Sequence, residues 1–166
     1  MKQASQLMSI LLLSATLAAC GGGSSSSSSS NTGAISSNCA GGSSASSGSA
    51  SVTSLTYVDT TVGTGATLAA GQNPSLTFTG WLYDSANPPT NEGTVFQPTA
   101  TNTGTAIGVG SFITGFDQGV LGMKVGGTRI LTIPASLAYG ACAPVNSGIP
   151  PNSAVIFSVT LNSIAS

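Results

Sequence analysis

The stretch from residue 21 to residue 54 places the strongest limit on what this 166-residue chain can fold into. It is dominated by Gly, Ser, Thr and Ala, and it contains seven consecutive serines, Ser24–Ser30. Such a composition cannot bury enough apolar surface to offset the entropy of ordering its backbone. We therefore expect a flexible tether over residues 20–54 and one folded domain over residues 55–166, which carry every aromatic side chain of the sequence.

Ionisable side chains are scarce in this chain, which has three Lys or Arg, four Asp or Glu and no His. Three positive charges cannot neutralise a phosphate backbone, so we expect no binding to nucleic acid. The absence of His removes His-dependent general base catalysis, Ser-His-Asp triads and most zinc sites. We expect neither a metal nor a cofactor, and any chemistry has to proceed without charged groups.

The first 20 residues have the layout of a secretory signal. Lys2 precedes an apolar run from Leu7 to about Leu17, which is shorter than the roughly 20 residues needed to cross a bilayer. The segment Leu17-Ala18-Ala19-Cys20 resembles the lipobox of bacterial lipoproteins. This resemblance implies a signal peptide over residues 1–19, a lipid on Cys20, and anchoring in the bacterial cell envelope, facing the periplasm or in the outer membrane. A short buried helix is the alternative.

Two further cysteines remain if Cys20 carries a lipid. Cys39 and Cys142 would then form an even pair in an oxidising compartment, and we expect a disulfide between them. It would close a loop of about 100 residues, for which chain entropy gives up to about 4.7 kcal/mol of stabilisation. The alternative is two unrelated thiols, one of them buried.

Apolar and polar residues alternate in several short segments beyond residue 55. This period of two is typical of strands with one buried face, and it runs through residues 76–81, 129–133 and 155–161. Residues 114–123 instead predict one short helix, in which Thr114 can cap the start, Asp117 lies in the first turn and Gly122 ends it. The predicted fold class is α+β: several antiparallel strands with one short helix.

Six segments occur in an order that resembles the FKBP-type peptidyl-prolyl cis-trans isomerases, over residues 57–165. These segments are Thr77–Gly80, Val95–Phe96, Phe112–Val120, Gly122–Gly127, Ile133–Gly140 and Ile149–Asn152. The resemblance implies a twisted antiparallel β-sheet wrapped around one short α-helix. It also implies an isomerase whose partners are proline-containing polypeptides. Longer relatives carry a helical dimerisation arm, which this sequence lacks, so we expect a monomer.

The resemblance also implies which side chains form the pocket. Phe116 would be the floor under the proline ring, Phe96 and Phe157 the walls, and the Ile113 N–H and the Tyr139 hydroxyl the donors to substrate carbonyls. These five are the predicted catalytic residues. The predicted substrate-binding residues are Phe78, Gln97, Phe112 and Ile149.

The chain departs from the family at three of these positions. Phe78 stands where relatives usually have Tyr, Gln97 where they have Asp, and Phe116 where they have Trp. Our main hypothesis is an isomerase that assists the folding of exported proteins. A catalytically weak chaperone or binding module with the same fold is the alternative that these departures favour. A surface adhesin or structural lipoprotein would explain the Ser/Thr/Gly composition but not the order of the motifs.

Overall fold

The computed structural model describes residues 44–165 of the chain. The predicted signal peptide, the lipid on Cys20, residue Cys39 and most of the predicted tether lie outside these residues. Within the described part, no helix is both long enough and apolar enough to cross a membrane.

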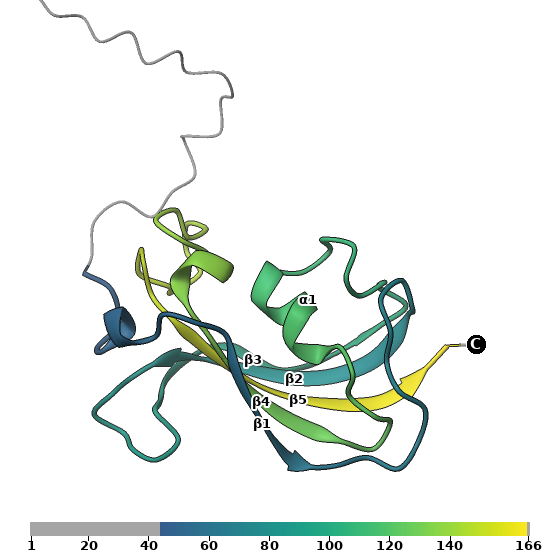
Figure 1. Ribbon diagram of the computed structural model, residues 1–166. Helices are drawn as coiled ribbons and strands as arrows, with labels where there is room; N and C mark the ends of the chain where they lie inside the picture. Colours follow the sequence, from purple (N-terminus) through teal and green to yellow (C-terminus); the bar gives the residue numbers. More distant parts are fainter. Residues whose placement is uncertain (1–43, 166) are drawn as a thin grey trace, which may run out of the picture. The chain divides into compact units, whose positions relative to one another are not determined.

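Five antiparallel strands form one sheet in the order β1-β4-β5-β2-β3. The strands are β1 (Thr56–Thr61), β2 (Pro74–Tyr83), β3 (Glu92–Thr103), β4 (Thr128–Ile133) and β5 (Val155–Ile164). The sheet curves around the helix α1 (Thr114–Val120), and the short 3-10 helices η1 (Ser49–Ser51) and η2 (Ala135–Leu137) lie at one end of it (Figure 1). The predicted α+β class, with a twisted sheet wrapped around one short helix, is confirmed.

The alternation expected from the sequence sets which face of each strand is buried. Val155, Phe157, Val159 and Leu161 of β5 are all buried, as are Leu131 and Ile133 of β4. The opposite face of the sheet carries hydroxyl side chains that bond in pairs across strands, such as Thr77 with Thr101 and Thr79 with Thr99. The core therefore lies between the concave face of the sheet and α1.

The helix α1 begins where the sequence indicates, but Thr114 is not its cap. Ile113 occupies the N-cap position and makes no side-chain cap, so the prediction for Thr114 was wrong. The reason is that the Ile113 carbonyl already accepts the Phe116 and Asp117 amides at 2.9 and 3.1 Å. The helix ends at Val120, and Gly122 follows in the left-handed region with φ 77°, which agrees with its predicted role as the stop.

Two glycines allow α1 to lie directly on β4. A Cβ on Gly119 would come 2.8 Å from Leu131 Cδ2, and a Cβ on Gly115, one turn earlier, would overlap the Ile133 side chain. Such distances are shorter than real side chains tolerate, so both positions depend on glycine. The spacing of four residues places the two glycines on the same face of the helix.

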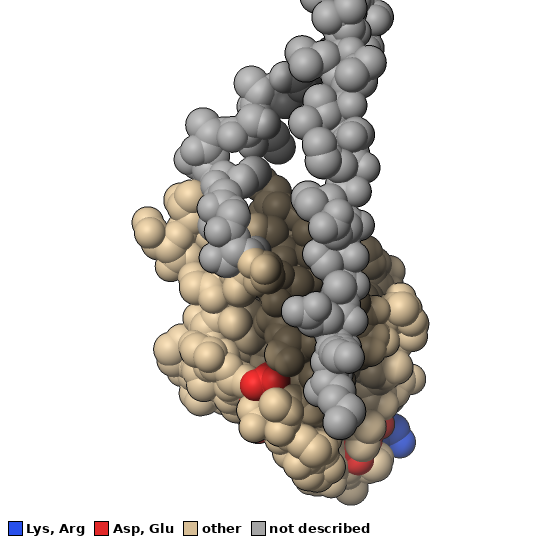
Figure 2. Space-filling view, turned by 90° about the vertical axis from the view of Figure 1, so that its left-hand side faces the viewer, with Lys and Arg blue, Asp and Glu red and all other residues tan. Residues whose placement is uncertain are grey.

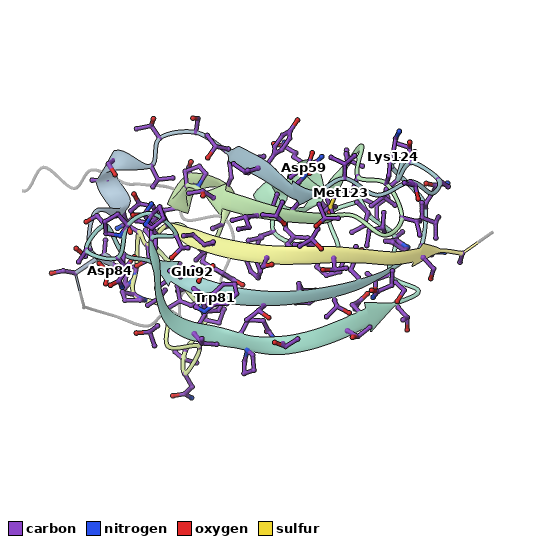
Figure 3. All side chains as sticks on the ribbon, turned by 90° about the horizontal axis from the view of Figure 1, so that it is seen from below. Asp59, Trp81, Asp84, Glu92, Met123 and Lys124 are labelled. Atoms are coloured by element: carbon purple, nitrogen blue, oxygen red, sulfur yellow. The ribbon has the colours of Figure 1, made fainter. Side chains whose placement is uncertain are left out.

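Arg129 of β4 joins the edge of the sheet to the end of α1. Its Nη1 donates to the Gly119 carbonyl at 2.8 Å and to the Leu121 carbonyl at 3.1 Å, while Nε and Nη2 bind Asp59 of β1 at 2.6 and 3.0 Å. Tyr57 packs its ring against the guanidinium, 4.1 Å away. The hydrogen bond from Arg129 lowers the pKa of Asp59, and the charge of Arg129 adds to this effect. Figure 3 shows Asp59 beside the outermost strand β1.

The described chain starts earlier than the predicted domain boundary at residue 55. η1 lies in the part of the sequence interpreted as tether, yet Ser49 is buried and its side chain bonds to the Ala154 amide. The composition of this segment predicts that it is not ordered, because it contains few apolar residues that could be buried. The structure uses its serines as hydrogen-bond partners instead.

Candidate functional site

A cavity of about 450 Å³ opens between the sheet and the start of α1. Its walls come from β2, β3, β5 and α1, from the loop before α1, and from the residues after η2. The lining side chains are Phe78, Gln97, Ser111, Phe112, Ile113, Phe116, Tyr139 and Phe157. This volume lies within the range of small-ligand pockets.

The structure brings together seven of the nine residues that the sequence predicted. The other two, Phe96 and Ile149, do not line the cavity. The Phe96 ring contacts that of Phe157, a lining residue, whereas Ile149 is buried, with 4% of its surface exposed. Ser111 lines the cavity and was not predicted. Its only sequence signal is its place beside Phe112, since a serine in a glycine-rich loop has no pattern of its own.

Phe116 forms the base of the cavity because α1 turns its ring toward the sheet. Its ring centre lies 5.4 Å from that of Phe78, 5.1 Å from that of Phe112 and 5.3 Å from that of Phe157. Only 2% of Phe116 is exposed. Three neighbouring rings therefore fix the orientation of this side chain, with edge-on or offset geometries that aromatic pairs prefer.

Phe96, Phe157 and Tyr139 form a second group of rings on one side of the cavity. The Phe96 ring meets Phe157 and Tyr139 nearly at right angles, with centres 5.5 and 6.1 Å apart. Phe96 thus supports the two rings that face the cavity, although it does not face the cavity itself.

Gly80 of β2 leaves room for the side chains on this side of the cavity, because it has no side chain of its own. A Cβ at Gly80 would come 2.8 Å from Phe157 Cε1, 2.9 Å from Phe96 Cζ and 3.0 Å from Gln97 Cβ. The Gly80 backbone is opposite Phe157 in β5 and Gln97 in β3. A larger residue here would displace three site residues at once.

Three neutral polar groups face or border the cavity. Within the described part of the chain, the Tyr139 hydroxyl and the Ile113 N–H have no hydrogen-bond partner, so both can donate to a ligand. Gln97 uses its amide nitrogen on the Pro98 carbonyl, at 3.0 Å. Burial raises the pKa of Tyr139, because it disfavours the phenolate, so this hydroxyl stays protonated at physiological pH.

None of the side chains that line the cavity is Lys, Arg, Asp or Glu. Among residues 44–165 no group of three His, Cys, Asp or Glu side chains could hold a metal ion. Figure 2 looks onto the end of the molecule that carries η1 and η2, and the surface not hidden by grey atoms is almost entirely uncharged. The arrangement can hold an apolar ring in a water-poor space and donate hydrogen bonds to carbonyls at its edge.

A comparison with protein families identifies the family to which this chain belongs. The family model for the FKBP-type peptidyl-prolyl cis-trans isomerases matches residues 65–162, which is more than half of the chain. This chain belongs to that family. The order of motifs, the fold and the family match agree.

Individual FKBP relatives support the same assignment. The chain is 37% identical over 115 residues to FK506-binding protein 1B of Neurospora crassa, covering 68% of this chain and 97% of that protein. It is 39% identical to an FK506-binding protein of Streptomyces anulatus, over 57% of this chain and 73% of the other. It is also 41% identical to FK506-binding protein 4 of Dictyostelium discoideum, but spans only 28% of that protein's length.

Two solved structures have a similar architecture. AtFKBP13 superposes with a TM-score of 0.54 at 33% identity, covering 67% of this chain and 93% of that one. A peptidyl-prolyl cis-trans isomerase from Pseudomonas syringae gives the same TM-score at 23% identity, covering 68% and 76%. The second likeness shows the fold alone.

Proposed function

We propose that this FKBP domain catalyses cis–trans isomerisation of X–Pro bonds in polypeptides, and that the cavity above Phe116 is where it does so. Rotation about such a bond breaks amide resonance, with a barrier of about 18–20 kcal/mol, and takes tens of seconds or more unaided. No covalent bond forms or breaks in this reaction. A cavity without ionisable side chains is therefore chemically sufficient.

The cavity would lower the barrier by favouring the twisted amide over the planar one. At the halfway point of the rotation the nitrogen loses conjugation and the carbonyl loses part of its dipole. An apolar, water-poor space destabilises the planar, more polar amide more than the twisted one, and only such differential binding accelerates a step. Each 1.36 kcal/mol of this difference gives about a factor of ten in rate.

Each site residue has a role in this proposal. The rings of Phe116, Phe157 and Phe78 would enclose the proline. The Ile113 N–H and the Tyr139 hydroxyl would hold carbonyls on either side of it, which fixes the flanking chain while the bond rotates. The single observation that carries the proposal is that these side chains, which come from separate elements, converge on one cavity lined without charges.

A prolyl-peptide isomerisation assay on the full chain tests this proposal. We expect Phe157→Ala to lower kcat/KM about 100-fold, because it removes a wall ring, and Tyr139→Phe to lower it about tenfold, because it removes one hydrogen bond worth roughly 1 kcal/mol or slightly more. Thr101→Ala, on the outer face of the sheet, is the control and should keep the wild-type rate. Unchanged rates in both site variants would contradict the proposed site. Binding of unfolded chains without acceleration would instead support the binding module.

For the setting of this activity we propose a lipid anchor on Cys20 that holds the domain in the bacterial cell envelope, where it acts on exported proteins. The support for this proposal is the sequence of residues 1–20. The serine-rich segment that follows would separate the folded domain from the membrane. Intact-mass analysis of protein from bacterial membranes should give a chain that begins at Cys20 and carries acyl groups. A chain with an unmodified Cys20 or an intact Met1 would contradict the anchor.

A further inference from the structure

The segment of residues 46–52, called here the N-terminal brace, is bound to the turn that precedes β5. The Ser46 amide donates to the Ser153 hydroxyl at 2.9 Å, and the Ala154 amide donates to the Ser49 hydroxyl at 3.0 Å. The Ser85 amide donates to the Ser47 carbonyl at 3.2 Å. Ser49, Ser153 and Ala154 are 5%, 1% and 0% exposed. The first two bonds, one partly buried and one buried, join parts of the chain more than 100 residues apart.

The turn that the brace binds is the base of a long loop. The Asn152 amide donates to the Gly140 carbonyl at 2.7 Å, which closes the loop between residues 140 and 152. Ser153 and Ala154 follow directly on one side of this closure. Cys142, which is disulfide-bonded, lies inside the loop, two residues after Gly140, and the two other cysteines of the chain lie outside the described residues. The loop base is therefore held by the N-terminal segment on the side that leads to β5.

The same loop base is joined to the cavity through Tyr139. Tyr139 is the residue immediately before Gly140, whose carbonyl accepts the Asn152 amide at 2.7 Å and whose amide donates to the Ala135 carbonyl of η2 at 2.8 Å, so the loop base and η2 together set where its backbone lies. Its ring packs against the core and meets the Phe96 ring nearly at right angles, and its hydroxyl has no partner among the described residues. The position of the Tyr139 hydroxyl thus depends on the backbone of the loop base.

The geometry points to the N-terminal brace as a positioning element for Tyr139, with Ser49 as its central residue. Ser49 touches neither the cavity nor the substrate. It acts by fixing the Ala154 amide and with it the loop base from which Tyr139 projects. This inference rests on the proposed function, because it concerns the hydroxyl that would hold a substrate carbonyl.

The brace lies outside the residues that the family model matches and outside the hydrophobic core. The family match starts at residue 65, and no residue of the brace belongs to the hydrophobic core or to the group packed against it. In Figure 1, η1 lies at the end of the sheet that also carries η2 and the loop leading to β5. Loss of a single brace contact should therefore leave the core and α1 folded.

A double-mutant cycle with the full chain tests the inference. We expect Ser49→Ala to lower kcat/KM about fivefold to tenfold in the wild-type background, since misplacing a binding group costs activity without removing it. In the Tyr139→Phe background the same change should have almost no effect, because the hydroxyl it positions is absent. Ser49→Thr keeps the hydroxyl and should retain most of the activity. Ser51→Ala is the control, since that exposed hydroxyl bonds only to Gly48 within the segment.

Hydrogen exchange provides the second measurement. The Asn152 and Ala154 amides should exchange faster in Ser49→Ala, while amides of β2 and β5 stay protected. A brace that only stabilises the fold would give equal losses in both backgrounds, or a lower Tm with unchanged kcat/KM, and either result would overturn the inference. The proposed function is judged separately, by wild-type activity and by the effect of Tyr139→Phe alone.

Discussion

Gly80→Ala should reduce kcat/KM for a prolyl peptide by about 100-fold in a protein that stays folded. The new methyl group would meet the rings of Phe96 and Phe157 at 2.9 and 2.8 Å and the Cβ of Gln97 at 3.0 Å. None of these atoms can move alone, because the rings pack on one another and Cβ follows the backbone. The wall of the cavity must shift, and a displacement of about 1 Å at a site can cost about 100-fold in rate.

The matched control is Thr79→Ala, one residue earlier on β2. Thr79 lies on the outer face and bonds to the Thr99 hydroxyl, so its replacement should lower stability by about 1 kcal/mol and leave kcat/KM unchanged. Gly80 has no positive φ, so alanine is not excluded there by its backbone. Near-wild-type activity in Gly80→Ala would show that the wall of the cavity does not take part in the reaction.

The fold of this domain could be predicted because apolar residues alternate in two central strands. In β4 every second residue is buried, and in β5 Val155, Phe157, Val159 and Leu161 are buried, so a shift by one residue would turn these side chains to the other face. Ile156 departs from this pattern, since it is 1% exposed. The start of α1 is less well encoded. Ile113 occupies the N-cap position although its side chain cannot cap a helix. This residue lines the cavity instead.

The aromatic members of the site were predictable for a different reason. Phe78, Phe112 and Phe116 lie in segments whose order matches the family, and the inward positions of Phe78 and Phe157 follow from the alternation in β2 and β5. Ile149 has the same support, yet the structure buries it outside the cavity lining. Motif order identifies a residue's neighbourhood, whereas packing decides whether its side chain reaches the cavity.

The N-terminal brace could not be predicted from the sequence. Residues 46–52 resemble the rest of the Gly/Ser-rich stretch, and the partners of Ser46 and Ser49 in the turn before β5 lie more than 100 residues away. Composition measures how much apolar surface a segment can bury. It does not register serine hydroxyls that complete the hydrogen bonds of another part of the chain. The role of Arg129 could not be predicted either, because a lone arginine in a strand gives no sign that its side chain binds the carbonyls at the end of a helix.

Arg129→Met should lower the free energy of unfolding by about 3 kcal/mol at pH 7, since it leaves two helix-end carbonyls and a carboxylate without their donor. Arg129→Lys is the control. Its single ammonium group keeps the charge but cannot bind Asp59, Gly119 and Leu121 together, so we expect about half of the loss. Urea titrations measure both effects, and an unchanged slope would show that the compactness of the unfolded state is unaltered.

The pH dependence of this loss separates the two sets of bonds that Arg129 makes. The pKa of Asp59 is lower in the folded protein than its ordinary value of 3.8, so the ion pair stabilises the fold above that value. This contribution is lost as the pH falls through the folded pKa of Asp59. The difference between wild type and Arg129→Met should therefore shrink below about pH 3.8. It should not reach zero, because the bonds to the Gly119 and Leu121 carbonyls do not depend on a carboxylate. If the difference in unfolding free energy between wild type and Arg129→Met stays constant from pH 7 to pH 2, the ion pair with Asp59, whose side chain is 34% exposed, adds nothing to the stability that Arg129 provides.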